Sequence, residues 1–462
     1  MIGLPPAAPI LSAAAMRAAE AAAFAAGVDQ DALMERAGLA VAREVLRVAL
    51  GRAVLILAGP GNNGGDGFVI ARFLREWGLA VTVAALPTRA DGSAARMRAR
   101  WNGPTIALAD AEPCPVLVDG LFGIGLTRPL APDVAAPLAR LCAAADYVVA
   151  IDVPSGCDAD AVHNFAGSVR PDLTVALGAL KPVHTTGRCG IVRLADLGIA
   201  LPIRMRTIAR PMIAPPARDA HKYTRGLVVV LGGAMPGAAR LAARAALSAG
   251  AGYVMLTGDD GAGPDALVHR DVADDGALQA LLGDERLSAV LVGPGLGRDD
   301  DAHRLVDAAL ACAAPLVVDG DALSLLGAEG VARIAGRTAP TWLTPHGGEF
   351  SRMFPDASGN KLDRTIAAAR QARATIVHKG PDTVIAAPDG TVVVAADAPS
   401  WLSTAGTGDV LAGILAARLK PDGARAAATA VWLHGRAAGL AGPAFIADAL
   451  VDHLGRAIAE CR

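Results

Sequence analysis

Short runs rich in Val, Ile and Leu alternate with longer Ala-rich stretches marked by Arg and Glu along the whole chain. The runs have the length and composition of strands buried on both faces, and the stretches between them have the period of helices. This alternation predicts parallel sheets with helices on both faces, which is an α/β fold. The expected strands cover residues 53–58, 80–84, 116–118, 147–151 and 173–177 in the first half, and 227–231, 253–256, 289–292, 316–318, 341–343 and 375–378 in the second.

One segment interrupts this alternation. Residues 201–218, LPIRMRTIARPMIAPPAR, carry several prolines and arginines and have no sustained period, so few regular backbone contacts are expected there. A chain of 462 residues is also longer than one hydrophobic core usually serves. We therefore expect two α/β domains, at residues 1–209 and 214–462.

Bulk composition excludes several kinds of partner. Hydrophobic residues make up 53% of the chain, charged residues 19%, and the formal net charge is -2. Such a chain can bury large cores, but it offers no basic field to a nucleic acid or an anionic membrane. We expect neither partner. The six cysteines are scattered without a CxxC pair, which is typical of reduced thiols in a cytoplasmic protein.

The apolar N-terminus has two interpretations. It resembles the core of a signal peptide, but it lacks a basic start and contains Arg17 and Glu20, which favours an ordinary first helix. No run in the chain reaches the roughly 18 uncharged apolar residues of a membrane span.

Residues 404–413, TAGTGDVLAG, stand directly before an apolar helical stretch. Glycines let a backbone approach a phosphate closely, and the free amides and dipole of a first helical turn favour its charge. Asp409 would repel that phosphate unless the site needs a base. For these residues alone, an ordinary helix start with an acidic first turn is the alternative interpretation.

The first half contains another glycine-rich segment, GPGNNGGDG at residues 59–67, after a predicted strand and before a helix expected at 68–77. It is not GxGxxG, so it does not indicate a standard dinucleotide fingerprint. Two more polar loops, at 119–129 and 152–156, also follow strands. Because strand ends gather at one edge of an open α/β sheet, Asn63, Asp119, Asp152 and Ser155 should converge. Such oxygen ligands suit a hard cation, and a monovalent ion fits at least as well as Mg²⁺. The alternative is that Asp119 and Asp152 each cap a following helix.

Several short motifs follow strands in the second half. Each is weak alone: His346 could be a hydrogen-bonded structural residue, and Lys379-Gly380 a strand end and turn. Their joint order at strand ends is the stronger signal. They are HKYTRG at 221–226, GPGLG at 293–297, DGDAL at 319–323, TPHGGEF at 344–350 and HKG at 378–380.

With these motifs the chain resembles the family of bifunctional NAD(P)H-hydrate repair enzymes, in which an epimerase is fused to an ADP-dependent dehydratase. The resemblance covers nearly the whole chain, and NNGGDG and TPHGGEF are its most specific motifs. It implies a Rossmann-like doubly wound first domain and a ribokinase-like second domain. In this family the epimerase interconverts R and S hydrates of NADH or NADPH, and the dehydratase restores the dinucleotide from the S form at the expense of a nucleotide.

The resemblance also implies roles for individual residues. Asp152 and Asp409 would contact substrate. We further expect both to be catalytic, with Asp152 as the acid/base of epimerisation and Asp409 as the base that takes the hydroxyl proton. The epimerase substrate would further contact Asn62, Asn63, Gly64, Gly65, Asp66, Gly123, Ile124, Gly125, Leu126, Thr127, Arg128 and Pro129. The dehydratase substrate would contact Ala238, Gly297 and His346, and the nucleotide Lys379, Gly380, Pro381, Asp382, Thr383 and Gly408. Asn63, Asp119 and Ser155 would bind K⁺, and Mg²⁺ would accompany ADP. The segment GALKPVHTTGRCG fits the family only loosely, so Lys181 receives no role.

Two other functions remain open at this point. A small-molecule kinase of the ribokinase-like type would use Asp409 in the same way, with the first domain as a dinucleotide-binding module. Alternatively, the first domain would bind or scaffold without turnover, although its Asp119 and Asp152 argue against that. We expect small-molecule substrates, the hydrated dinucleotides and ADP, and a homo-oligomer.

Overall fold

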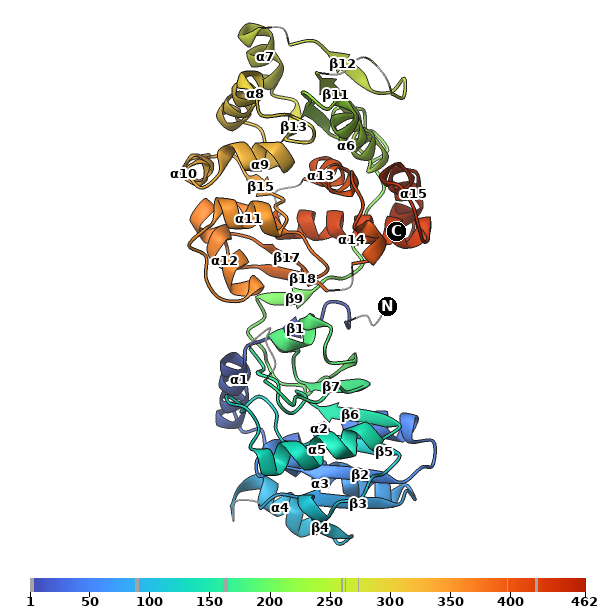
Figure 1. The fold of residues 1–462 in the computed structure, drawn as a ribbon. Helices are drawn as coiled ribbons and strands as arrows, with labels where there is room; N and C mark the ends of the chain where they lie inside the picture. The colour runs from blue at the N-terminus through green and yellow to red at the C-terminus, as the bar shows by residue number, and fades with distance from the viewer. Residues whose placement is uncertain are drawn as a thin grey trace. The chain divides into compact units, whose positions relative to one another are not determined.

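The structure is a computed structural model that describes residues 4–87, 91–160, 165–258, 261, 263–272, 274–396, 398–419 and 423–462. The chain divides into two units, residues 1–207 and 208–462 (Figure 1). This division falls within the segment 201–218 that interrupts the sequence pattern. Among the described residues, no helix is both long and apolar enough to cross a membrane.

Unit 1 is built on a parallel sheet of seven strands in the order β4-β3-β2-β5-β6-β7-β8. Its elements are β1 (Pro9–Ile10), α1 (Ala13–Ala25), α2 (Gln30–Ala49), β2 (Val54–Ala58), α3 (Asn62–Glu76), β3 (Val81–Ala85), α4 (Gly92–Arg100), β4 (Thr105–Ala107), β5 (Val116–Gly120), α5 (Pro132–Ala144), β6 (Tyr147–Ile151), β7 (Leu173–Leu177), β8 (Ile191–Ala195) and β9 (Met205–Thr207). The strand order reverses between β2 and β5, so their carboxyl ends open a crevice there, as in other doubly wound folds.

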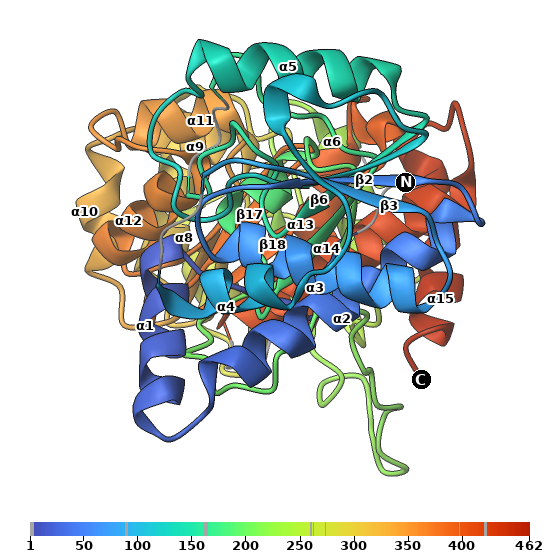
Figure 2. The same ribbon diagram turned by 90° about the horizontal axis from the view of Figure 1, so that it is seen from below.

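Alternating side chains of β2 build two cores, one on each face of this sheet. Val54 and Ile56 pack with buried residues of α2 and α3, whereas Leu55 and Leu57 pack with buried residues of α5. Figure 2 shows α5 on one side of β2 and β3, with α2 and α3 on the other. The predicted doubly wound α/β architecture is confirmed for this unit.

The nine strands of unit 2 follow the order β18-β17-β16-β15-β14-β13-β10-β11-β12. All neighbours are parallel except in the β16-β17-β18 meander. Its elements are β10 (Leu227–Leu231), α6 (Pro236–Ser248), β11 (Tyr253–Thr257), β12 (Val268–Arg270), α7 (Asp275–Leu282), β13 (Leu287–Val292), α8 (Asp300–Ala311), β14 (Leu316–Val318), α9 (Gly320–Leu326), α10 (Gly330–Ala335), β15 (Thr341–Leu343), α11 (Gly347–Met353), α12 (Lys361–Ala372), β16 (Thr375–His378), β17 (Thr383–Ala386), β18 (Val392–Ala395), α13 (Thr407–Arg418), α14 (Gly423–Ala441) and α15 (Ala447–Ala459).

Every predicted strand is present, but the sequence pattern missed several others. Strands β1, β4, β9 and β12 are too short to show a period, β8 has a charged residue at its centre, and β17 and β18 form an antiparallel hairpin instead of continuing the parallel order. The expectation of few regular contacts in 201–218 is wrong for β9, which pairs antiparallel with β1. Because the partner strand lies at the far end of the unit's sequence, no local pattern reveals this pairing.

The segment NNGGDG is also not the loop that its composition indicates. Helix α3 already begins at Asn62, six residues before the predicted start. Its glycines do not serve positive φ angles here; they allow close packing. A Cβ on Gly64 would lie 1.9 Å from the Gly59 carbonyl oxygen, and one on Gly65 would lie 2.7 Å from the Met34 sulfur.

We expect Gly64→Ala to lower the free energy of unfolding by about 3 kcal/mol, because the backbone of Gly59 cannot make room for a methyl group. Urea denaturation of the full chain measures this effect. Gly61→Ala is the matched control, since a Cβ at that position meets nothing within 4 Å. Equal unfolding midpoints for the two variants would contradict this reason for the glycine.

Candidate active sites

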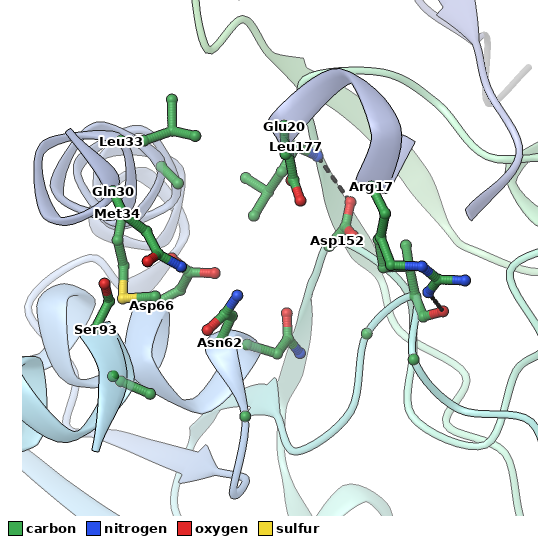
Figure 3. Close-up of a pocket in the computed structure, with 18 of the residues that line it drawn as sticks. Arg17, Glu20, Gln30, Leu33, Met34, Asn62, Asp66, Ser93, Asp152 and Leu177 are labelled. Atoms are coloured by element: carbon green, nitrogen blue, oxygen red, sulfur yellow. Dashed lines mark hydrogen bonds between the residues drawn. The ribbon is translucent and has the colours of Figure 1, made fainter. Parts of the chain in front are cut away.

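A cavity of about 660 Å³ opens at the carboxyl ends of β2 and β5 in unit 1 (Figure 3). The start of α3 contributes Asn62, Asn63 and Asp66 to its lining. The loop after β5 contributes Leu121 to Leu126, and Asp152 follows β6. The crevice that the strand order predicts is therefore the place where the candidate residues of unit 1 meet.

Some predicted substrate-binding residues lie outside this lining. Within the part of the chain that the structure describes, Gly64 and Gly65 face neighbouring backbone and side chains, not the cavity. Thr127, Arg128 and Pro129 continue the loop beyond Leu126 without lining the cavity. The cavity instead includes residues that the sequence motifs did not indicate, among them Arg17, Glu20 and Phe24 of α1 and Ser93 of α4.

Asp152 is the most constrained residue of this cavity. Its φ angle is 60°, in the left-handed region that non-glycine residues seldom adopt. The Asp152 carboxylate forms an ion pair with the Lys181 ammonium and accepts a hydrogen bond from the Leu177 amide at 2.9 Å. Its carbonyl oxygen lies 2.7 Å from His184 Nε2. Backbone and side chain of Asp152 are thus both fixed.

Lys181 and His184 come from a turn of 3₁₀ helix after β7 and complete this arrangement. The Lys181 ammonium is buried and also donates to the carbonyls of Leu177 and Ala179, each at 2.9 Å. His184 Nδ1 accepts the Lys181 amide at 2.8 Å, so its proton sits on Nε2 and is donated to Asp152. Burial, followed by the Lys181 charge, lowers the pKa of His184 to about 4 and keeps it neutral.

Two further carboxyls share the cavity with Asp152. Glu20 points to the same end as Asp152, and Asp66 lies on the wall formed by α3 (Figure 3). Burial and the charge of Asp152 raise the pKa of Glu20, although Lys181 and Arg17 act in the opposite direction. Burial raises the pKa of Asp66 well above its ordinary value, with Asp152 and Glu20 adding to the shift. The site therefore combines one carboxylate that is paired with a cation and two carboxyls whose pKa is raised.

The predicted cation ligands also converge. Asp119 is fully buried and accepts hydrogen bonds from the Ser155 hydroxyl at 2.6 Å and the Ser155 amide at 2.8 Å. The Ser155 hydroxyl in turn accepts the Phe122 amide at 3.0 Å. Asn63 lies against the same loop, and its buried Nδ2 has no partner among the described residues.

The environment of Asp119 fits a singly charged hard cation. Burial raises the pKa of Asp119 against the effect of its hydrogen bonds, and no Lys or Arg among the described residues pairs with it. A buried carboxylate in this situation is stabilised by a bound cation. The neighbouring oxygen donors carry no charge, so the set supplies a single negative charge.

In unit 2 the strand order reverses around β10, and loops after β13, β14, β15 and β16 meet at the same edge. The Asp319 carboxylate, directly after β14, accepts the Thr344 hydroxyl at 2.6 Å and forms an ion pair with Lys379 at 2.7 Å. Burial lowers the pKa of Lys379, but the charges of Asp319, Glu349 and Asp409 outweigh that effect and raise it. Lys379 is a fixed cation.

Asp409 lies in the first turn of α13, whose N-cap Gly406 has a φ angle of 86°. Burial and the charge of Asp319 raise the pKa of Asp409 to about 7, with Asp321 adding to the rise and Lys379 opposing it. A Cβ on Gly408 would lie 3.4 Å from Lys379 Nζ. The predicted glycine-rich helix start, its carboxylate and the lysine therefore form one site.

The other predicted residues of unit 2 surround this site in two groups. The Gly297 amide donates to Asp321 at 3.1 Å, and Gly295 lies against Ala238. His346 forms the N-cap of α11 in a capping box with Glu349, the residue whose charge acts on Lys379. The Thr383 hydroxyl donates to the Gly380 carbonyl at 2.9 Å, which closes the segment after Lys379 into a turn that contains Pro381. Within this turn, Asp382 forms an ion pair with Lys361 at 2.7 Å.

The motifs missed Lys181, His184, Glu20 and the pairing of Asp319 with Lys379. Lys181 follows strand β7, so its place at the same sheet edge was the available signal. Glu20 sits in a helix whose sequence shows only an apolar pattern, and nothing local marks it.

Comparisons with known proteins match both units. A family described as YjeF-related protein N-terminus matches residues 30–183, and one described as NAD(P)H-hydrate dehydratase matches residues 228–460. A bifunctional NAD(P)H-hydrate repair enzyme from Mycobacterium tuberculosis H37Rv is 38% identical over 89% of this chain and 90% of its own. The enzyme of that name from Mycobacterium leprae is 36% identical over 97% of this chain and 98% of its own.

Among solved structures, a ribokinase-like superfamily protein from Enterococcus faecalis V583 is 26% identical with a TM-score of 0.50. It covers 56% of this chain and 96% of its own, and it confirms the fold predicted for the second domain. Since family matches cover both units and the relatives share nearly the whole length, the chain belongs to the family of bifunctional NAD(P)H-hydrate repair enzymes.

Proposed function

We propose that unit 1 interconverts the R and S hydrates of NADH and NADPH in the cytoplasm, and that unit 2 uses ADP to convert the S hydrate back to the reduced dinucleotide. One observation carries this proposal: each unit holds a constrained carboxyl at the open edge of its sheet, Asp152 beside buried Lys181 and Asp409 in the first turn of α13. A homo-oligomer remains a prediction from the sequence.

In unit 1, Asp152 acts as the acid/base at the hydrated carbon. The hydroxyl-bearing carbon changes configuration when its hydroxyl leaves and water returns on the opposite face, and both steps move a proton. Lys181 and the Leu177 amide hold the Asp152 carboxylate in one orientation, and neutral His184 fixes its backbone. A cavity of about 660 Å³ is large enough for the nicotinamide end of a dinucleotide.

Asn63, Asp119 and Ser155 would hold K⁺ beside this cavity. The ion would neutralise the buried Asp119 carboxylate and so stabilise the loop after β5 that lines the cavity. In this proposal the ion takes no part in proton transfer, which is carried out by the side chains of the cavity.

Replacing K⁺ by tetramethylammonium at equal ionic strength should slow epimerisation and lower the melting temperature of the wild-type chain. Ser155→Ala should raise the K⁺ concentration needed for half-maximal epimerisation by about tenfold or more, because the Asp119 carboxylate loses the hydroxyl that orients it. Dehydration of the pure S hydrate by the same preparation is the control. An unchanged rate and melting temperature without K⁺ would refute the cation site.

In unit 2, Asp409 takes the proton of the substrate hydroxyl as the oxygen attacks the terminal phosphorus of ADP. AMP leaves, and the free amides at the start of α13 and the Lys379 ammonium stabilise the charge on the transferred phosphoryl group. Phosphate then departs with the C–O electron pair and takes up the proton that the neighbouring ring carbon releases. The double bond of the reduced nicotinamide is thereby restored.

Mg²⁺ would reach this site on the nucleotide. The described residues contain no group of three or more His, Cys, Asp and Glu side chains placed to hold a metal ion. Mg²⁺ commonly binds through substrate phosphates, and its chemistry there would be charge neutralisation on those oxygens.

The dehydratase should depend on pH through Asp409. Since the base must be ionised and its pKa is raised to about 7, kcat/KM should fall tenfold per pH unit below that value and level off above it. Rates with S hydrate and saturating ADP across the neutral range test this. A profile that is flat through neutrality would contradict the assignment of Asp409 as the base.

The direct test of the proposal uses chemically prepared hydrates, R-enriched and S-enriched, with ADP, ATP or no nucleotide. Return of reduced-nicotinamide absorbance from both isomers with nucleotide supports both activities. Recovery from the S form alone would refute the epimerase, and no recovery from either would refute the dehydratase. The alternative function, a small-molecule kinase, does not explain why unit 1 matches the family described as YjeF-related protein N-terminus.

A further inference from the structure

Helix α1 forms a wall of the epimerase cavity although it precedes the residues, 30–183, that match the family of unit 1. Ser12 caps the helix, and the Ala13 amide donates to Asp160 at 2.7 Å, so its start is anchored. The Arg17 guanidinium donates to the Ile124 carbonyl at 3.2 Å. These contacts fix the helix over the cavity and aim Glu20 into it (Figure 3).

The Glu20 carboxyl is free to meet a ligand. No hydrogen bond or ion pair to this carboxyl occurs within the described part of the chain. Four charged or titratable groups face it: Arg17 from its own helix, Asp152 and Lys181 from the loops after β6 and β7, and Asp66 from α3. Arg17 is engaged with Ile124 and Lys181 with Asp152, so neither cation pairs with Glu20.

We propose that Glu20 is a second catalytic carboxyl of the epimerase, which donates a proton to the departing hydroxyl while Asp152 receives a proton from the returning water. This inference rests on the proposed function of unit 1. Glu20 and Asp152 enter the same end of the cavity from different elements, so both carboxyls can reach one bound ring.

Glu20 gives its proton to the hydroxyl, the C–O bond breaks with its electron pair, and water forms; the adjacent ring nitrogen shares its lone pair with the carbon. Water then adds from the opposite face, a new C–O bond forms, and its surplus proton passes to the Asp152 carboxylate. Turnover leaves Glu20 ionised and Asp152 protonated, a state that acts on the S hydrate in the reverse direction or returns by exchange with solvent.

Burial and the Asp152 charge raise the pKa of Glu20, which is the direction that a proton donor needs. The pKa of Asp66 is raised as well, but Asp66 lies on the α3 wall away from Asp152 in Figure 3. We therefore expect Asp66→Asn to change mainly KM and Glu20→Gln to change kcat.

The experiment measures conversion of R hydrate in the full chain, with the chain's own dehydratase activity on S hydrate as an internal control. Glu20→Gln should lower the epimerase kcat by about 100-fold or more with KM changed less than about threefold, and Glu20→Asp should recover part of the loss. The loss of wild-type activity at high pH, where Glu20 ionises, should disappear from the residual activity of Glu20→Gln. Glu44→Gln, a partly buried glutamate of α2 that pairs with Arg47 outside the cavity lining, is the matched control and should match the wild type.

Three results would overturn the inference. Glu20→Gln could epimerise within threefold of the wild type, Glu20→Gln and Glu20→Asp could lose activity equally through KM, or only Asp66→Asn could lose kcat. Failure of the wild type to convert the R hydrate would instead refute the proposed function, so the two failures are distinguishable. A melting temperature of Glu20→Gln equal to that of Glu44→Gln establishes that the variant is folded.

Discussion

Replacing Asp409 with Asn is expected to lower the dehydratase kcat by about 1,000-fold or more, while binding of ADP changes little. Asn keeps the size of the side chain but cannot take the hydroxyl proton. The variant leaves in place the amides of the first turn of α13 and the Lys379 ammonium, which bind the phosphates in the proposed mechanism. Single-turnover rates with S hydrate and calorimetric titration with ADP measure the two effects separately.

The same variant carries its own control for folding. A carboxyl whose pKa is raised on folding destabilises the folded protein at pH values above its folded-state pKa. This destabilisation vanishes as the pH falls below the pKa of the same carboxyl in the unfolded chain. Asp409→Asn should therefore raise the melting temperature of unit 2 at about pH 8 and change it much less at about pH 5, because the pKa is raised to about 7. A variant that melts lower at both pH values would have lost structure as well as its base.

Replacing Asp152 with Asn is expected to slow epimerisation by about 1,000-fold, with the dehydration of S hydrate unchanged. Asn tolerates the left-handed backbone of this position, so the loss reports the missing carboxylate more than a strained fold. Following R hydrate in the presence of ADP gives the rate, since only the S form is consumed further. An Asp152→Asn variant that is folded and still epimerises at a near-normal rate would refute the assignment.

Lys181→Met provides a companion measurement. It leaves the Asp152 carboxylate in the same buried place without its cation, so unit 1 should lose about 3 to 5 kcal/mol of stability in addition to activity. The double variant, Asp152→Asn with Lys181→Met, should be more stable than Lys181→Met alone. If the two single effects simply add, the pair is not coupled.

The sequence predicted the sheets well because buried parallel strands are continuous apolar runs. It also predicted which strand ends carry polar loops, and the structure brings Asn63, Asp119 and Ser155 together as that argument expects. It failed where the determining contact is remote in sequence. Strand β9 depends on β1, and the glycines of α3 depend on the backbone of Gly59. Turn composition alone therefore misassigned the start of that helix.

The candidate site shows the same division. Motifs named Asp152 and Asp409, but the groups that hold Asp152 come from an element to which no role was assigned, the 3₁₀ turn that carries Lys181 and His184. Whether a carboxyl is paired or protonated depends on burial and on neighbouring charges. Those neighbours lie on other strands and helices, so local sequence cannot reveal them.

The left-handed backbone of Asp152 has an evolutionary consequence. Glycine adopts this conformation without cost, so Asp152→Gly would relieve backbone strain, but it would remove the acid/base and leave the buried Lys181 ammonium without its counter-charge. Stability and epimerase turnover therefore both favour a carboxylate at this position, against the strain of its backbone. In a lineage that no longer needed the epimerase, residue 152 should drift only after Lys181 has been replaced.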